Sequence, residues 1–257
     1  MKKDINNLVV PEETKVAVIV PLYGYWKDAN GDQLTADILK FSLHRIITSS
    51  LKQYIIFVGE KERLSDDVAS ILGSKAVGGN VGFVDVPKGT PYALYIKNGI
   101  DFVLRNTNAH FIIGYNPWIM VRHGSLELLC DRLNKQDVSI VSSFELKGLI
   151  DPKDFDTWSA PMGYREERDM NPNFWGMIRS TAEMIPLDAN FKTHYFFGRD
   201  LWQQSYSKGF DIITSQYIPS YSFDVDWTLI EDVDQFEEDK KCFVSKWKFD
   251  PSIKYKQ

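Results

Sequence analysis

The chain has 257 residues, of which 44% are hydrophobic and 25% charged, a composition typical of a globular protein large enough for one α/β domain. Its formal net charge of −5 argues against binding to a nucleic-acid backbone, and its two cysteines exclude a disulfide framework or a cysteine metal cluster. No apolar run is long enough to span a membrane and no signal-peptide pattern is present, so the sequence predicts a cytoplasmic protein.

Buried strands alternate with amphipathic helices through the first half of the chain. The clearest strand is Val16–Val20, an apolar, mostly β-branched run that Pro21 ends. Further strands are expected at 54–58, 81–86, 111–113 and 138–144, and helices at 35–50, 64–73, 90–105 and 126–133. This alternation predicts βαβ units, a mostly parallel sheet flanked by helices, and ligand binding outside the carboxyl ends of the strands.

The second half of the chain has a different character. Residues 151–173 are polar and form a segment too long for an ordinary connection, so a functional loop or lid is expected there. Strands are expected at 175–178 and 210–213, with a helix at 200–208 between them. The acidic run at 231–239 is predicted to be a solvated helix or tail without a role in ligand binding.

Several short motifs follow one another in a recognisable order. They are IVPLY at 19–23, NVGF at 80–83, YNPW at 115–118, HGSL at 123–126, FWGMIR at 174–179, LDANF at 187–191 and DLW at 200–202. In this order and spacing, residues 15–225 resemble the family-2 glycosyltransferases of the GT-A fold, and their rhamnosyltransferase-like branch in particular.

The resemblance implies a single GT-A-like (Rossmann-like) α/β domain over residues 1–257. Its nucleotide-binding half would cover about 15–110, its acceptor half about 111–225, and an acidic C-terminal extension 226–257. The implied activity is transfer of a hexose or deoxyhexose from a nucleotide diphosphate sugar to a glycan or polysaccharide precursor.

The loops at the strand ends offer groups for a nucleotide sugar. Tyr23, Glu60 and Asp85 are available to a base and ribose, although Glu60 and Asp85 could instead cap turns. A diphosphate needs cations or backbone N–H groups, which Lys88 and Gly89 supply at a turn into a helix. Lys97 either points the same way or is a solvated helix residue. The resemblance adds Pro21, Asn80 and Asn116 to the donor site.

The chain departs from the family where metal and base are expected. The family's D-x-D aspartate pair, which binds Mg²⁺ or Mn²⁺, is replaced by Asn116, a weaker ligand, and Trp118, which cannot ligate. The family's E-D pair falls on phenylalanine and glycine at 196–198. Asp200 then remains as the catalytic base, with His194 as a substitute.

Three accounts fit these departures. Asp224 and Asp226 replace the lost metal ligands, or the enzyme is metal-independent and places cations on the diphosphate. The cations available for the second account are Lys88, Lys97, Arg165 and Arg168. In the third account catalysis is lost, and the domain binds a glycan, a nucleotide sugar or a protein.

An acceptor sugar would need a stacking surface. Trp158, Tyr164 and Trp175 are candidates for it, and the alternative is that these rings pack the 151–173 segment onto the body. A carboxylate of Asp200, Asp224 or Asp226 facing Asn116 would favour activity. Trp118 filling that space would favour binding or inactivity.

Overall fold

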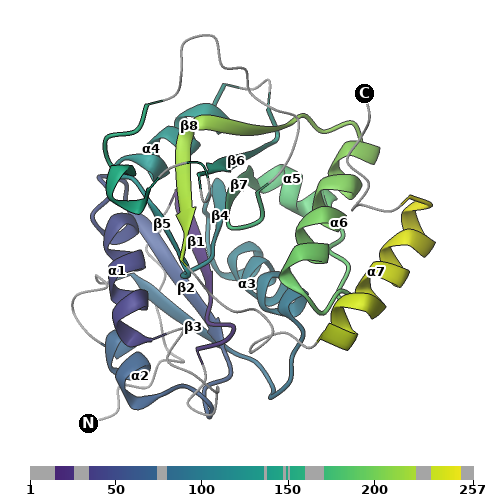
Figure 1. Ribbon diagram of the computed structural model, residues 1–257, viewed down its shortest axis with the longest axis horizontal. Coiled ribbons are helices and arrows are strands. Elements are labelled where there is room, and N and C mark those ends of the chain that lie inside the picture. The colour runs from purple at the N-terminus through teal and green to yellow at the C-terminus, as the bar shows by residue number, and fades with distance from the viewer. Residues whose placement is uncertain are drawn as a thin grey trace.

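The computed structural model describes residues 15–25, 35–73, 80–135, 138–146, 149, 151–159, 171–223 and 233–249. The predictions for Tyr164, Arg165, Arg168, Asp224 and Asp226 lie outside these residues. The described part forms an eight-stranded sheet with helices packed around it (Figure 1). Over these ranges, no helix combines the length and the apolar character that a membrane crossing requires.

The sheet has the strand order β3-β2-β1-β4-β7-β6-β8-β5. Its strands are β1 (Val16–Pro21), β2 (Gln53–Gly59), β3 (Val81–Asp85), β4 (Phe111–Tyr115), β5 (Ile119–Val121), β6 (Ile140–Glu145), β7 (Phe174–Ile178) and β8 (Ile212–Ser222). The four strands β3, β2, β1 and β4 are parallel, and so are β6 and β8. Strand β7 is antiparallel to both of its neighbours and joins the two parallel groups.

The apolar runs of the first half become these central strands. Every residue of β1 is buried, because β1 lies between β2 and β4 with both of its faces covered. The structure thus confirms the mostly parallel α/β sheet that the alternating pattern predicts. It differs at β8, which extends to Ser222, and at β5, which the sequence does not indicate.

The helices cover the sheet and one end of the molecule. They are α1 (Ala36–Ile47), α2 (Asp66–Gly73), α3 (Tyr92–Asn106), α4 (Ser125–Leu133), α5 (Arg179–Met184), α6 (His194–Ser207) and α7 (Val233–Trp247), with a short 3₁₀ turn, η2 (Pro152–Asp154). Helix α3 packs on β1 and β2, and α4 packs on β6, β7 and β8. Helices α6 and α7 lie side by side at the right of Figure 1.

Trp175 belongs to the core of the sheet. It stands opposite Gly114 in the β4–β7 pair and is fully buried. A Cβ atom on residue 114 would lie 2.3–2.6 Å from three atoms of the indole, so only glycine leaves room for this ring. The prediction that Trp175 stacks on an acceptor sugar is therefore wrong. Its side chain belongs to a central strand and has no exposed surface.

Helix α7 is the acidic segment expected to be solvated, and most of its first half is exposed. Asp239 is the exception, since only 1% of its surface is accessible. Its carboxylate accepts hydrogen bonds from Lys192 N, Thr193 N and Thr193 Oγ1 over 2.8–3.1 Å. This residue fastens α7 to the start of α6, a structural role that the charge pattern alone does not reveal.

Candidate functional site

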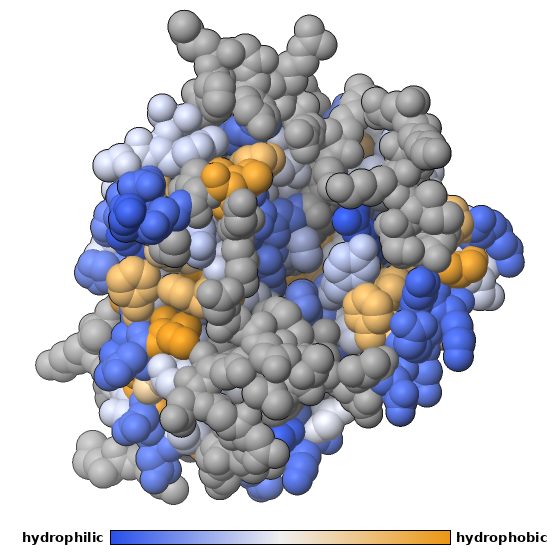
Figure 2. Space-filling view, in the orientation of Figure 1, coloured by the Kyte–Doolittle hydropathy of each residue, from blue (hydrophilic) through white to orange (hydrophobic). Residues whose placement is uncertain are grey.

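The carboxyl ends of β1 to β4 meet at one side of the sheet, which we call the carboxyl edge, because these four strands are parallel. Four predicted residues follow or end these strands: Tyr23 after β1, Glu60 after β2, Asp85 at the end of β3 and Asn116 after β4. Figure 2 shows the molecule hollowed between β8 and α6, with hydrophilic residues inside the hollow. In α/β sheets, ligands bind in the crevice outside the carboxyl ends of the strands.

Three tyrosines form an aromatic cluster at this edge. Tyr23 meets Tyr92 edge-on at a centroid distance of 5.5 Å and Tyr95 at 5.3 Å. All three rings are at least 95% buried. Pro21, the last residue of β1, is buried as well and pairs with Val58. Tyr23 and Pro21 therefore shape the floor of the edge, and little of their surface can touch a ligand directly.

Asn116 has the hydrogen bonds of its side chain supplied by the protein. Its Oδ1 accepts the Tyr92 hydroxyl proton at 2.5 Å, and its Nδ2 donates to Asn173 Oδ1 at 3.0 Å and to the Pro172 carbonyl at 3.3 Å. Only 1% of Asn116 is exposed. An amide held in this way orients the loop after β4, and its oxygen is already occupied by a donor.

Trp118 lies beside Asn116 and fills space at the carboxyl edge. It is 1% exposed, and its Nε1 donates to Asn173 Oδ1 at 3.2 Å. The His194 ring meets Trp118 edge-on at 5.8 Å and Tyr92 at 6.0 Å. His194 is the first residue of α6 and is half-buried, and the structure brings its imidazole ring to this group.

Glu60 and Asp85 make the contacts of turn-capping residues. Glu60 is 2% exposed, and its Oε1 accepts from Gly89 N at 2.9 Å and from the Tyr95 hydroxyl at 3.0 Å. Gly89 adopts a φ of 77°, a conformation that favours glycine, and this turns its N–H toward Glu60. Asp85 Oδ1 accepts from Lys61 N at 3.0 Å. The N–H of Gly89 is therefore committed to Glu60 in this structure.

The two lysines expected at a diphosphate have different surroundings. Lys88 is exposed on the turn between β3 and α3, at the carboxyl edge. Lys97 lies within α3, and its Nζ is 2.6 Å from Asp101 Oδ2, one turn further along the helix. Asn80 precedes β3 and therefore lies at the opposite edge of the sheet, where its carbonyl accepts from Ile55 N. The structure brings Lys88 to the edge and leaves Asn80 away from it.

Asp200 faces α7. It is 2% exposed, and its Oδ1 accepts from Trp247 Nε1 and lies 2.8 Å from Lys246 Nζ, while its Oδ2 accepts from Gln204 Nε2. Burial alone would lower the pKa of Lys246, but its hydrogen bonds to Asp188 and Asp200 outweigh burial and raise it. The Asp200 carboxylate is thus engaged by Trp247 and Lys246 of α7, and among the described residues no hydrogen bond links it to Asn116.

A polar network that the sequence did not single out extends from Asn116. Asn173 Nδ2 donates to Ser222 Oγ at 3.5 Å, and Ser222 donates from N and Oγ to the two carboxylate oxygens of Glu145 at 2.9 and 2.8 Å. Glu145 ends β6 and Ser222 ends β8, so parallel pairing of these strands brings them together. The position of Glu145 directly after the expected strand at 138–144 is the sequence feature that could have identified it as a residue at a strand end.

Trp158 follows β6 and lies near the same network. Its ring stacks on Phe144 with the ring centres 6.5 Å apart and the planes 17° from parallel, and the Arg122 guanidinium is 5.7 Å from its centre. The side chain is half-buried and retains accessible surface. It is the one predicted acceptor residue among the described ranges with a surface for stacking, and its acceptor role stays a prediction.

No protein-family model matches the sequence, and no curated protein does. The fold, in contrast, is similar to crystal structures of S. aureus TarS, a GT-A glycosyltransferase. TarS 1-349 matches with a TM-score of 0.59 and 9% identity, over 91% of this chain and 65% of the other. The longer TarS chain matches with a TM-score of 0.59 and 8% identity, over 91% and 39%, respectively. TarS 1-349 in complex with UDP matches with a TM-score of 0.57 and 9% identity, over 91% and 65%.

The chain thus spans less than two thirds of the length of each of these proteins. At such low identity the likeness concerns the fold alone. The mostly parallel sheet flanked by helices is the α/β fold of the GT-A glycosyltransferases.

Proposed function

We propose that this chain is a cytoplasmic glycosyltransferase that transfers a hexose or deoxyhexose from a nucleotide diphosphate sugar to a glycan or polysaccharide precursor, as in the rhamnosyltransferase-like branch. The observation that carries the proposal is the arrangement of the sheet. The carboxyl ends of the parallel strands β1 to β4 lie together at the carboxyl edge, and the antiparallel strand β7 lies next to β4. A protein of the same fold forms a complex with UDP, which supports a nucleotide-sugar ligand. UDP is therefore the first nucleotide to test.

The described residues do not fit the divalent metal that the fold family implies. The Asn116 oxygen already accepts from Tyr92, and Trp118 has no oxygen to offer. Over the same ranges, no three His, Cys, Asp or Glu side chains lie close enough together to hold a metal ion. The proposed transfer therefore relies on cations of the protein, and a metal site would need Asp224 and Asp226, which lie outside these ranges.

Lys88 is our candidate for the positive charge that a departing diphosphate requires. It is exposed at the carboxyl edge, whereas Lys97 is paired with Asp101. In the transfer, an acceptor hydroxyl oxygen bonds to the anomeric carbon while the bond from that carbon to the diphosphate oxygen breaks. The electron pair leaves on the diphosphate, where a fixed cation stabilises it.

The proton of the acceptor hydroxyl must pass to a base, and we assign this role to His194. An imidazole ring nitrogen can accept a proton from a hydroxyl, and the ring lies against Trp118 and Tyr92. Asp200, the other candidate, would first have to give up Trp247 and Lys246. Loss of transfer in His194→Ala with retention in Asp200→Asn would support this assignment, and the reverse result would contradict it.

A second candidate function is binding without catalysis. Trp118 is buried beside Asn116 at the place where the family carries a metal ligand, and this observation favours a domain that holds a nucleotide sugar or a glycan. Nucleotide binding without release of UDP from UDP-sugars, over a panel of acceptor glycans, would support this alternative.

The test is calorimetric titration of the whole chain with UDP, GDP and dTDP, each with and without Mn²⁺. We expect UDP binding that does not depend on Mn²⁺ and that weakens about tenfold in Lys88→Ala, because one fixed charge is lost. Lys97→Ala is the matched control and should bind as the wild type does. No binding of any of the three nucleotides would overturn the proposed donor site, and strong dependence on Mn²⁺ would favour Asp224 and Asp226.

A further inference from the structure

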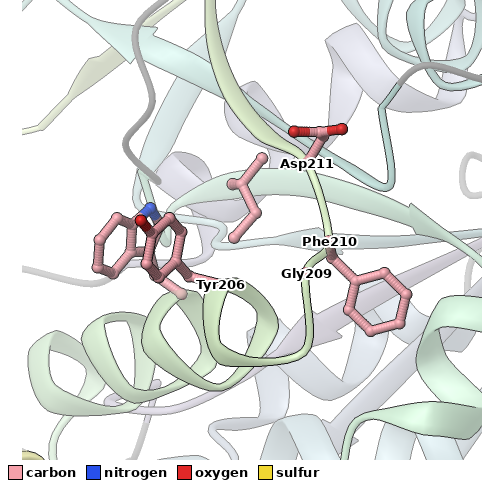
Figure 3. A pocket seen from close by; sticks show the side chains of 6 residues that line it. Tyr206, Gly209, Phe210 and Asp211 are labelled. Atoms are coloured by element: carbon pink, nitrogen blue, oxygen red, sulfur yellow. The ribbon is translucent and has the colours of Figure 1, made fainter.

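We propose a second carbohydrate site on this chain, one that takes a single neutral pyranose ring at the junction of α6 and β8. The site is a shallow cavity of about 100 Å³ (Figure 3). Its lining residues are Trp202, Tyr206, Gly209, Phe210, Asp211 and Ile212. None of them belongs to the carboxyl edge, so the proposal does not depend on the proposed transfer reaction.

One wall of the cavity carries two aromatic side chains. Trp202 and Tyr206 lie one helical turn apart on α6, and their rings stack with centres 5.4 Å apart and planes 5° from parallel. Tyr206 is 58% exposed. Because stacked rings cover part of each other's faces, the surface that this pair offers to a ligand is mainly the outer face of the exposed Tyr206 ring, which Trp202 holds in place. The C–H face of a pyranose packs well on such a wall.

Besides the aromatic side chains, the cavity is lined by the Asp211 carboxylate. Figure 3 shows it on a different side of the cavity from Tyr206. Its backbone is fixed, since the Asp211 carbonyl accepts from Ser139 N at 2.8 Å and Ile140 N at 3.2 Å. Within the described residues, no hydrogen bond or ion pair engages the exposed carboxylate. Two carboxylate oxygens can accept from neighbouring hydroxyls of one sugar ring.

The charge of the cavity narrows the class of ligand. A carboxylate repels phosphates, so Asp211 disfavours nucleotides and nucleotide sugars, which would otherwise stack on the same rings. A neutral sugar offers both an apolar face and hydroxyl donors. The aromatic side chains and the carboxylate together therefore favour a neutral pyranose over a phosphorylated ligand.

The cavity also lies at the other end of β8 from the carboxyl edge. Ile212 begins β8 and Ser222 ends it within the network of Glu145 and Asn173. Because Ile140 pairs with Ile212 and Glu145 with Ser220, this part of β8 spans the length of β6, roughly 16 Å at about 3.3 Å per residue, and two further residues reach Ser222. A sugar in this cavity would therefore not compete with a nucleotide at the carboxyl edge.

The test follows the indole N–H resonance of Trp202 in ¹H–¹⁵N spectra of the whole chain, assigned with Trp202→Phe. The probes are methyl β-D-glucopyranoside, methyl α-L-rhamnopyranoside and N-acetylglucosamine. We expect at least one probe to shift this resonance saturably, and both Tyr206→Ala and Asp211→Asn to weaken binding by about tenfold or more. Tyr217→Ala removes another exposed tyrosine, which is 66% exposed on β8, and should leave binding unchanged.

The same titration is repeated with UDP present, and the shift should persist because the two sites are separate. The proposal is overturned if no probe shifts the Trp202 resonance, if the shift survives in both variants, or if UDP abolishes it. A chain that binds no UDP but gives the expected shift would sink the proposed donor site and leave this carbohydrate site standing.

Discussion

Hydrogen bonds within the protein decide what the buried polar residues of the carboxyl edge can do. Asn116 and Glu60 are each at most 2% exposed, and their side-chain oxygens accept from donors within the protein. Buried polar atoms need such partners, because leaving one unpaired costs about 1–3 kcal/mol. These two residues therefore hold the site in shape, and Lys88 and His194 retain the accessible surface that chemistry needs.

Tyr92→Phe tests this view of Asn116. The change removes the hydroxyl that donates to Asn116 Oδ1 and leaves a buried acceptor unpaired, so we expect a loss of about 1–3 kcal/mol in the free energy of unfolding. Urea denaturation measures it. Tyr217→Phe removes the hydroxyl of an exposed tyrosine and is the control, with no expected change. Equal stabilities of Tyr92→Phe and the wild type would mean that the bond contributes nothing.

The two cysteines should differ in reactivity. Burial, with a further contribution from Glu127, raises the pKa of Cys130 to about 12, and the thiolate is the reactive form. Cys242 is exposed on α7. Iodoacetamide should therefore modify Cys242 alone in the folded protein, as mass spectrometry of the intact chain would show, and Cys242→Ser should abolish the reaction. Modification of Cys130 under native conditions would contradict its burial.

At the scale of elements, carboxylates tie helices to distant turns. Glu127, in the first turn of α4, accepts from Ser49 Oγ, Ser50 N and Ser50 Oγ over 2.7–3.0 Å, and this holds α4 to the turn after α1. Burial would raise the pKa of Glu127, but these hydrogen bonds outweigh burial and lower it. A lowered pKa means that the folded protein favours the ionised form.

Glu127→Gln should therefore destabilise the protein in a pH-dependent way. The stabilisation is fully present above the pKa that Glu127 has in the unfolded chain, and it is lost as the pH falls through the lower pKa of the folded state. We expect a difference from the wild type of roughly 1–2 kcal/mol at neutral pH that shrinks in acid. Urea denaturation across pH measures it. Asp131→Asn, an exposed residue of the same helix, should show no such trend.

Helix α7 depends in the same way on Asp239. Replacing Asp239 with alanine leaves the N–H groups of Lys192 and Thr193 without their acceptor at the start of α6. We expect a loss of about 2 kcal/mol in the free energy of unfolding, the upper range for a lost helix cap. Glu237→Ala, an exposed position on α7, is the control in the same thermal or urea experiment. A change confined to the control would refute the anchoring role.

Sequence patterns predict elements better than they predict contacts. The continuous apolar runs of β1, β2 and β4 identify buried strands, because such runs fit a parallel sheet covered on both faces. They do not reveal that β7 runs antiparallel or that β8 pairs with β5, since strand partners are chosen by tertiary packing.

The site shows the same limit. Tyr23, Asp85 and Asn116 reach the carboxyl edge because each lies at or just after the end of a parallel strand, and this much follows from the sequence. Asp200 does not reach this edge, because its carboxylate is bound by Trp247 and Lys246 of α7. These residues lie 47 and 46 positions further along the chain. Such a contact leaves no periodic signal in the sequence.

At the scale of the whole molecule, the sheet contains two parallel groups joined by β7, with β5 antiparallel at one edge. The first group, β3-β2-β1-β4, is built from the first half of the chain, and the second from later residues. The first group includes β4, which falls within the 111–225 range expected for the acceptor half, so the division of the sheet and the expected division of the chain differ by this strand, and the donor and acceptor roles of the two halves stay a prediction. The aromatic cavity at the start of β8 belongs to the second group and lies at the end of that strand away from the carboxyl edge.

The pairing of β5 with β8 has a consequence for how the chain is made. Ile119 pairs with Ser222, so β5 leaves the ribosome long before its partner has been synthesised. Closing such a long loop is entropically unfavourable, so we expect this pairing to form late in folding. Until then, the apolar residues of β5 have no neighbour in the sheet. The nascent chain is therefore open to aggregation or to a chaperone at this strand, and its finished form depends on the timely arrival of β8.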